Sequence, residues 1–317
     1  MVGEGIAART AAAIAENVRK VIRGKDELVR LAVAGLLTEG HLLIEDVPGL
    51  GKTTLARAMA RSIGGRWSRI QFTPDLLPGD ITGVTVYRQR DERFSFMPGA
   101  VFANVVVADE INRGTPKTQS ALLEVLEERR VTVDGESHEV PRPFLVVATQ
   151  NPIELEGTYR LPEAQLDRFL MRLSVGYPDR ASEVAVVLGY SAGDNADDLP
   201  AVVDTLTLQK AIDEVRAQHV DPKLADYAVR LAQATREHTA LRFGASVRGS
   251  IALVRAAQAI AATDGRSYVT PDDIKYVAVP VLAHRLVRTA EAELNLRSTE
   301  GVVAEVLAAV PVPTASA

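Results

Sequence analysis

Short, continuous apolar runs recur through the first 178 residues of the chain, and each run ends in polar residues. The runs span residues 41–46, 105–109, 144–149 and 170–175, and residues 69–72 are predicted as a shorter strand. Unbroken runs of this length are typical of strands that are covered on both faces of a parallel sheet. Helical patterns alternate with the runs, at 6–21, 26–37 and 54–62. The alternation predicts an α/β fold.

Two further segments alternate apolar and polar residues, which is the pattern of an exposed hairpin. The first, residues 82–97, turns at 90–92. The second, residues 131–140, turns at Asp134-Gly135, a dipeptide that fits a two-residue turn. We therefore expect two β-hairpins inserted between the elements of the sheet.

The pattern changes after Tyr177. From there on, apolar residues recur at helical spacing, and we expect helices with only loops between them. Asp221 and Thr270 mark helix starts, because each is a capping residue followed by proline at the first helical position. The polar stretch 194–204 is expected to be a linker, and the tail 311–317 is expected to fray.

Composition narrows the class of protein. The 317 residues are 47% hydrophobic but only 5% aromatic, so the core must be built mainly from Ala, Val, Leu and Ile. The net charge of -5 does not favour nonspecific binding to nucleic acid. The absence of cysteine excludes disulfides, cysteine-ligated zinc and thiol catalysis. No apolar run is long enough to span a bilayer, and the N-terminus lacks the layout of a secretory signal, so we expect a soluble cytoplasmic protein.

A phosphate-binding motif follows the first predicted strand. Residues 46–53 read DVPGLGKT and open a helix, which is the context of a P loop, the Walker A motif. Lys52 would reach the β and γ phosphates, and Thr53 would offer its hydroxyl to Mg²⁺. Asp46 stands where the motif expects its first glycine, and the alternative is a glycine-rich turn that binds no nucleotide. The residues expected to bind the nucleotide are Pro48, Gly49, Leu50, Gly51, Lys52, Thr53 and Thr54.

Two acids and an amide end the later strands. Asp109 and Glu110 follow an apolar run, at the edge where ligands bind in open α/β sheets. Asp109 would hold Mg²⁺ together with Thr53, and Glu110 would activate the attacking water. Asn151 could contact the same water, or it could simply be a turn residue before a proline. These residues predict an enzyme that hydrolyses ATP with Mg²⁺.

Several segments together resemble the MoxR family of AAA+ ATPases. They are residues 44–54 (IEDVPGLGKTT), 109–113 (DEINR), 117–128, 148–152 (ATQNP), 161–169 (LPEAQLDRF) and 244–248 (GASVR). The resemblance covers nearly the whole chain, apart from the N-terminal helix and the tail. It implies an AAA+ P-loop NTPase core with a parallel sheet and hairpin inserts, followed by a C-terminal all-α lid domain.

The resemblance sets the domain boundaries that we expect. They are an N-terminal helix with an adenine-side segment at 1–25, the AAA+ core at 26–178, a helix and linker at 179–205, the helical lid at 206–310 and a flexible tail at 311–317. Hairpin 82–97 looks like the insert in the second helix of this clade. The hairpin at Asp134-Gly135 looks like the one that precedes the first sensor.

The resemblance also implies roles for single residues. Asn151 matches the first sensor and Arg248 the second. Arg168 matches the arginine finger, which acts in trans on the γ-phosphate bound by the neighbouring subunit. Val21, Ile22 and Gly24 are similar in position to adenine contacts, although ordinary packing at a helix end is the alternative.

The residues themselves leave the two arginines open. Arg168 could instead form a surface ion pair with Glu163 or Asp167. Arg248 lies in the first turn of a helix that Ser246 is expected to cap, where a cation opposes the helix dipole. An anionic ligand nearby would resolve that conflict, which favours a functional role for Arg248.

For the biological role, the resemblance implies a homo-hexameric ring that remodels or activates client proteins. It includes a chaperone-like part in metalloenzyme maturation, with a separate partner that carries a von Willebrand A domain. The alternatives are a nucleic-acid-associated AAA+ motor or regulator and a magnesium-chelatase-like metal-insertion subunit. Arg129, Arg130 and Arg142 would give the motor local positive charge, but the acidic total and the lack of a DNA-binding appendage disfavour it.

Overall fold

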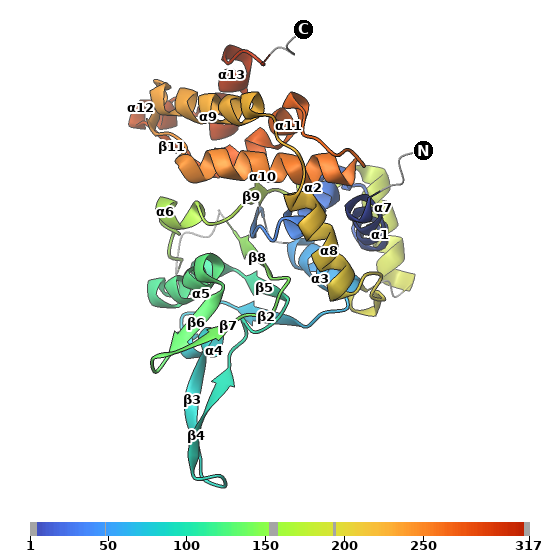
Figure 1. The fold of residues 1–317 in the computed structure, drawn as a ribbon, viewed down its shortest axis with the longest axis vertical. Helices are drawn as coiled ribbons and strands as arrows, with labels where there is room; N and C mark the ends of the chain where they lie inside the picture. The colour runs from blue at the N-terminus through green and yellow to red at the C-terminus, as the bar shows by residue number, and fades with distance from the viewer. Residues whose placement is uncertain (1–4, 48, 152–157, 193–194, 314–317) are drawn as a thin grey trace.

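A parallel sheet of five strands forms the centre of the protein (Figure 1). The computed structural model describes residues 5–47, 49–151, 158–192 and 195–313. The strand order is β2-β5-β8-β1-β9. The strands are β1 (Leu42–Glu45), β2 (Trp67–Gln71), β5 (Val105–Asp109), β8 (Leu145–Gln150) and β9 (Met171–Leu173). Each apolar run that predicted a buried strand is a strand of this sheet, so the predicted α/β fold is confirmed.

Side chains of the central strands alternate between two hydrophobic clusters, because successive residues of a strand point to opposite faces. On β5, Val105 and Val107 belong to one cluster, whereas Val106 and Ala108 belong to the other. The first cluster continues into the helices before and after β1, and the second into the helix after β5. Both faces are covered, which explains why these strands lack polar alternation in the sequence.

Helices connect the strands and cover the sheet. They are α1 (Ile6–Arg19), α2 (Asp26–Leu37), α3 (Lys52–Ser62), α4 (Pro78–Thr82), α5 (Pro116–Glu128), α6 (Glu163–Leu166) and α7 (Arg180–Ala192), with 3₁₀ turns η1 (Ile111–Arg113) and η2 (Ala196–Asp198). The start of α5 shows why the chain becomes helical there. The Thr115 hydroxyl accepts the Thr118 backbone N–H at 3.3 Å, and Pro116 occupies the first helical position, where its missing N–H costs nothing.

Both predicted hairpins are present. The first joins β3 (Gly83–Arg88) to β4 (Arg93–Pro98) and projects from the body of the molecule (Figure 1). The second joins β6 (Arg130–Val133) to β7 (Glu136–Glu139), and its turn residues Asp134 and Gly135 both have positive φ, as a tight hairpin turn requires. Phe96 of the first hairpin stacks on His138 of the second, with ring centroids 3.8 Å apart. The two hairpins therefore contact each other.

The C-terminal part is mainly helical. Its helices are α8 (Thr205–Arg216), α9 (Pro222–Glu237), α10 (Val247–Thr263), α11 (Pro271–Leu282), α12 (Ala290–Leu294) and α13 (Thr299–Ala309), with the 3₁₀ turn η3 (Ala283–Arg285). Asp221 and Thr270 cap helix starts as predicted, since their side chains accept backbone N–H groups of α9 and α11. Within the described ranges, no helix has the length and apolar character needed to cross a membrane.

The expectation of helices with only loops between them is wrong for this part. Strands β10 (Leu241–Phe243) and β11 (Val287–Arg288) form a short antiparallel pair. Strands of two or three residues are too short to show a period of two in the sequence. They pair because the chain leaving α9 and the chain leaving η3 run side by side, and pairing satisfies backbone groups that would otherwise need water.

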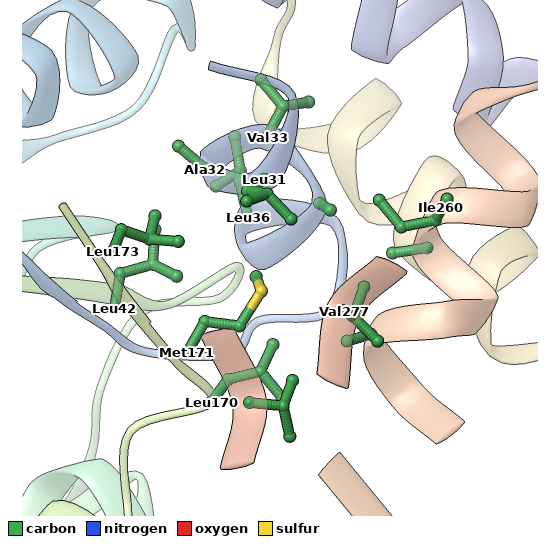
Figure 2. Close-up of a cluster of buried hydrophobic side chains, with 14 of the residues drawn as sticks. Leu31, Ala32, Val33, Leu36, Leu42, Leu170, Met171, Leu173, Ile260 and Val277 are labelled. Carbon is green, nitrogen blue, oxygen red and sulfur yellow. The ribbon is translucent and has the colours of Figure 1, made fainter. Parts of the chain in front are cut away.

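The helical part packs directly on the sheet. Figure 2 shows Leu36 of α2, Met171 of β9, Ile260 of α10 and Val277 of α11 in one buried group, and each is at most 1% exposed. One hydrophobic cluster thus runs from the sheet into the C-terminal helices. In addition, α1 lies against α8. The hydrophobic cluster is continuous across the expected boundaries at 25, 178 and 205. Those boundaries, and the one at 310, stay a proposal.

Candidate active site

The predicted P loop links the end of β1 to the start of α3. Gly49 and Gly51 have φ of 84° and 83°, a region that other residues rarely adopt. A Cβ on either glycine would meet no described atom within 4 Å, so the loop is an open cradle and the glycines serve its backbone angles. Leu50 packs against the first hydrophobic cluster and anchors the loop. Pro48 lies outside the described residues.

Lys52 begins α3 and reaches across the end of β8. Its Nζ donates to the carbonyl oxygens of Gln150 at 3.2 Å and Val47 at 3.3 Å, and also to that of Asp46. The amine therefore sits at the C-terminal edge of the sheet, beside the cradle. Thr54 is half-buried in the same first turn of α3. A helix start with a lysine at this edge is an anion-binding arrangement.

Asp46 has a structural explanation for its place in the motif. Its carboxylate accepts hydrogen bonds from the Ser174 hydroxyl and the Gly176 N–H, both at 2.7 Å, and from the Val47 N–H at 2.8 Å. Partial burial pushes the pKa of Asp46 up, but these hydrogen bonds outweigh it and hold the pKa below its usual range. Asp46 thus ties the P loop to the segment that follows β9.

Asp109 and Thr53 come together as predicted. The Thr53 hydroxyl donates to Asp109 Oδ1 at 2.9 Å, and the Asp109 carboxylate is almost wholly buried. A hydroxyl and a carboxylate are oxygen ligands of the kind that Mg²⁺ prefers, so the pair fits a magnesium ion. Arg69 on β2 donates its Nε–H to Asp109 Oδ2 at 2.7 Å, which leaves Oδ1 facing Thr53.

Glu110 is held by three contacts. Its φ of 55° is unusual for a residue other than glycine, and its N–H donates to the Thr149 hydroxyl at 3.0 Å. Its Oε2 accepts from Gln71 Nε2 and from the Arg113 guanidinium, both at 3.0 Å. The carboxylate is therefore tethered toward β2 and η1 through Oε2.

Asn151 lies at the end of β8, buried and next to the same edge of the sheet. Its carbonyl oxygen accepts the amide of Asn112 at 3.1 Å. Asn112 follows Glu110 by two residues, so this bond fixes the chain after β8 to the chain after β5. The structure therefore brings Asn151 near Asp109 and Glu110, as the sequence predicted.

A cleft of about 1070 Å³ lies beside the C-terminal ends of β1 and β8. Gly24 and Lys25 line one side of it, and Pro280 and Glu300 of the helical part line another. Of the expected adenine contacts, Gly24 lines this cleft, whereas Val21 and Ile22 do not. Ile22 is only 7% exposed and packs in the first hydrophobic cluster, and Val21 packs against it. Their role toward adenine stays a prediction.

Arg168 and Arg248 do not line this cleft, and the two side chains share one contact residue. Both contact Glu127 at the end of α5: Arg168 Nε is 3.1 Å from Oε2, and an Arg248 Nη2–H donates to Oε1. The acids considered from the sequence, Glu163 and Asp167, are not the partners of Arg168 in these contacts. Ser246 caps α10 as predicted, accepting the Arg248 N–H at 3.1 Å.

The two arginines lie at the N-terminal ends of the strands, whereas the P loop lies at their C-terminal ends. Arg168 comes just before β9 begins, whereas Lys52 comes after β1 has ended, and the two strands are parallel. The pocket around the arginines is lined by Gly40 and His41, which precede β1. A four-residue strand is about 13 Å long, so neither arginine lies at the phosphate cradle of the same chain.

Comparison with known proteins gives two family matches. Residues 41–171 match the model of the ATPase family associated with various cellular activities (AAA), and residues 233–306 match an AAA lid domain. The Chaperone MoxR1 of Mycobacterium tuberculosis is 44% identical over 95% of this chain and 82% of its own length. The chain belongs to the MoxR family of AAA+ ATPases.

Two further matches support the MoxR assignment. The protein YeaC of Bacillus subtilis, whose function is uncharacterised, is 48% identical over 94% of this chain and 93% of its own. A crystal structure of a protein from Cytophaga hutchinsonii, described as an ATPase, superposes with a TM-score of 0.90 at 37% identity, over 97% of this chain and 96% of that one. The predicted AAA+ core, the lid and the hydrolysis of ATP are thereby confirmed.

Some residues of this MoxR-family site were missed by the sequence reasoning. Arg69 and Gln71 lie on the edge strand β2 and reach the two acids of β5. Glu127 holds both arginines. The one signal for β2 was its alternation of polar and apolar residues, which indicates that one side of a strand faces a polar site. Glu127 gave no signal, since acids are common at exposed positions of helices.

Proposed function

We propose that this MoxR-family ATPase works as a Mg²⁺-dependent ring in which Arg168 and Arg248 of one subunit complete the active site of the next. The observation that carries the proposal is the position of the arginine pair at the edge of the sheet opposite to Lys52. A head-to-tail ring places one edge of each subunit against the other edge of its neighbour. Six subunits are the expectation from the family resemblance.

The chemistry follows from the placement of each group. Lys52 and the start of α3 bind the phosphates, and Thr53 and Asp109 would hold Mg²⁺, which would supply positive charge to the phosphates. Glu110, whose carboxylate Gln71 orients through Oε2, takes a proton from the attacking water. Guanidinium groups of the neighbouring subunit stabilise the charge that develops on the transferred phosphoryl group.

The proposal is tested by separating binding from turnover. Arg168→Ala should bind ATP with a Kd within about threefold of wild type, because its own cradle is intact, yet hydrolyse it at least about 100-fold more slowly. Wild-type turnover per subunit should rise with protein concentration as rings form. A variant that loses binding and turnover together would place Arg168 in its own subunit's site and contradict the ring.

The work done by the ring is proposed to be remodelling or activation of client proteins. Support comes from the relative named as a chaperone and from hairpin β3–β4. Near its tip, Tyr87 and Phe94 are 53% and 72% exposed, with ring centroids 5.2 Å apart. Exposed aromatic pairs on a projecting ribbon suit contact with another protein.

We also propose a role in metalloenzyme maturation, together with a partner that carries a von Willebrand A domain. One experiment can identify both this partner and the client. Affinity capture should use Glu110→Gln, which binds ATP but does not cleave it, with Lys52→Ala as the nucleotide-free control. Proteins retained by the first and not by the second are the clients and partners. Recovery of DNA or RNA instead, in proportion to ATP, would favour a nucleic-acid motor.

The structure weighs against that motor. The arginines considered as a positive patch are already paired: Arg129 and Arg142 contact the buried Glu39, and Arg130 contacts Glu128. Paired arginines offer less charge to a phosphate backbone than the sequence suggested.

A further inference from the structure

Glu127 stands between the two arginines that are proposed to act across the subunit boundary. One carboxylate oxygen faces Arg168 and the other faces Arg248. The three side chains are 38%, 27% and 50% exposed, respectively, so the group lies open to the surface. Without the carboxylate, the two guanidinium groups would repel each other. The arrangement therefore keeps two like charges together on one carboxylate.

The two arginines are brought to Glu127 from different parts of the chain. Asp167, next to Arg168, accepts the Ser246 hydroxyl at 2.8 Å and the Nε–H of the buried Arg285 at 2.7 Å. Ser246 also caps the helix that carries Arg248. The core segment and the lid helix are thus fixed to each other beside Glu127, and the arginine pair is preformed.

The contact between Glu127 and Arg168 is incomplete. The Nε atom of Arg168 is buried and lies 3.1 Å from the Glu127 carboxylate, but it has no hydrogen-bond partner among the described residues. A buried donor without an acceptor is costly, so a better placed anion would be favoured. The adjoining pocket of about 250 Å³ is positive overall, since its charged lining residues are Arg129, Arg168, Arg248, Arg255, Arg285, Glu39, Glu127 and Asp167.

We propose that Glu127 is a positioning residue that holds the arginine pair in the unassembled subunit and gives it up to the neighbour's nucleotide in the ring. The inference rests on the proposed function. The carboxylate carries one negative charge, whereas the γ-phosphate, which ADP lacks, carries more, so ATP displaces Glu127 more readily than ADP. The exchange makes the engagement of both arginines depend on what the neighbouring subunit has bound.

The adjacent glutamate provides a matched control. Glu128 is on the same helix turn and is also partly exposed, but it pairs with Arg130 at 3.2 Å and contacts neither arginine of the pair. Glu128→Gln removes the same charge without touching the pair. Glu127→Gln keeps the size of the side chain and removes the charge that competes with phosphate.

The test measures assembly with hydrolysis blocked by Glu110→Gln. Mass photometry gives the subunit concentration at half-assembly in saturating ATP and in saturating ADP. Glu127→Gln should lower that concentration in ATP at least threefold and narrow the gap between ATP and ADP. Glu128→Gln should change it less than twofold. Equal behaviour of the two glutamine variants would overturn the inference.

A second measurement separates positioning from a general effect on the fold. When Arg168 and Arg248 are both replaced by alanine, the effect of Glu127→Gln on assembly should disappear; an effect that persists would show that Glu127 acts by another route. The two claims fail differently. If replacing the arginines changes neither assembly nor turnover, the proposed ring chemistry fails. If it changes them while Glu127→Gln matches Glu128→Gln, only the role of Glu127 fails.

Discussion

At the scale of single residues, we propose Lys52 as the group on which nucleotide binding depends most. Its Nζ lies at the C-terminal ends of β1 and β8, next to a cradle that two glycines keep open. Lys52→Ala should weaken ATP binding at least tenfold, since a charged hydrogen bond to phosphate contributes about 1.5–3 kcal/mol. Isothermal titration with ATP and Mg²⁺ measures this. Lys117→Ala, an exposed change on α5, should bind as wild type does, and wild-type affinity in Lys52→Ala would refute the phosphate site.

Asp46 illustrates a departure from the motif that only the structure explains. Its carboxylate holds Ser174 and Gly176, so Asp46→Ala should reduce stability by about 1 kcal/mol, a modest value because solvent reaches the site. Since the folded state lowers the pKa of Asp46, the contribution is complete above its unfolded pKa and is lost as the pH falls through the folded value.

Urea unfolding of the Asp46 variant checks this at pH 7 and again in acid. The difference from wild type should be present at pH 7 and shrink in acid. Asp91→Ala, an exposed change at the tip of hairpin β3–β4, should have no such effect. If the stability difference grew on acidification, the hydrogen bonds to the Asp46 carboxylate would not be its source.

At the scale of elements, a buried glutamate joins three of them. Glu39, after α2, has a fully buried side chain that contacts Arg129 and Arg142 at the base of hairpin β6–β7 and Arg216 of α8. Burial raises the pKa of Glu39, but the bonds from Arg142 and the charge of Arg129 outweigh it and lower the pKa to about 2. The hairpin is thus fixed to the sheet and to the helical part through one carboxylate.

Glu39→Gln should therefore be strongly destabilising, by about 3–5 kcal/mol at pH 7, because it leaves three arginines beside a neutral buried group. The pKa of Glu39 is depressed on folding, so its contribution is full above pH 4.5 and is lost as the pH falls toward about 2. Thermal unfolding at pH 7 and pH 3 should show a smaller gap in acid. Glu139→Gln, on the exposed side of β7, is the control, and equal melting of both variants would contradict the role of Glu39.

The elements also show which parts of the fold can be predicted from the sequence. Helix α2 and strand β5 were predicted to the residue, because their apolar patterns are long or unbroken and their ends are marked by polar residues. The pair β10–β11 was missed, since two short strands carry no period. The Glu39 cluster was invisible as well, because its arginines lie 90 to 177 positions from Glu39 in the chain and only folding brings them together.

At the scale of the whole molecule, we propose that functional residues lie at both ends of the strands of the sheet. The P loop, Asp109 and Glu110 lie where the strands end, and Arg168 lies where they begin. The motifs could be predicted from the sequence one by one, but their placement on opposite edges could not, because it depends on strand direction and on the position of Glu127. Subunits with two different edges join head to tail, and such contacts close into a ring when the rotation allows.

Mixing two inactive variants tests the shared site most directly. Lys52→Ala lacks the phosphate site but keeps Arg168, whereas Arg168→Ala has the reverse defect. Each alone should be inactive, and an equal mixture should recover up to about a quarter of the wild-type ATPase rate, because about that share of boundaries joins an intact cradle to an intact arginine. Lys52→Ala and Glu110→Gln are both defective on the nucleotide-binding side of the shared site, so a mixture of these two should recover no activity. If the first mixture is no more active than the sum of its parts, hydrolysis does not use a guanidinium from the neighbouring subunit.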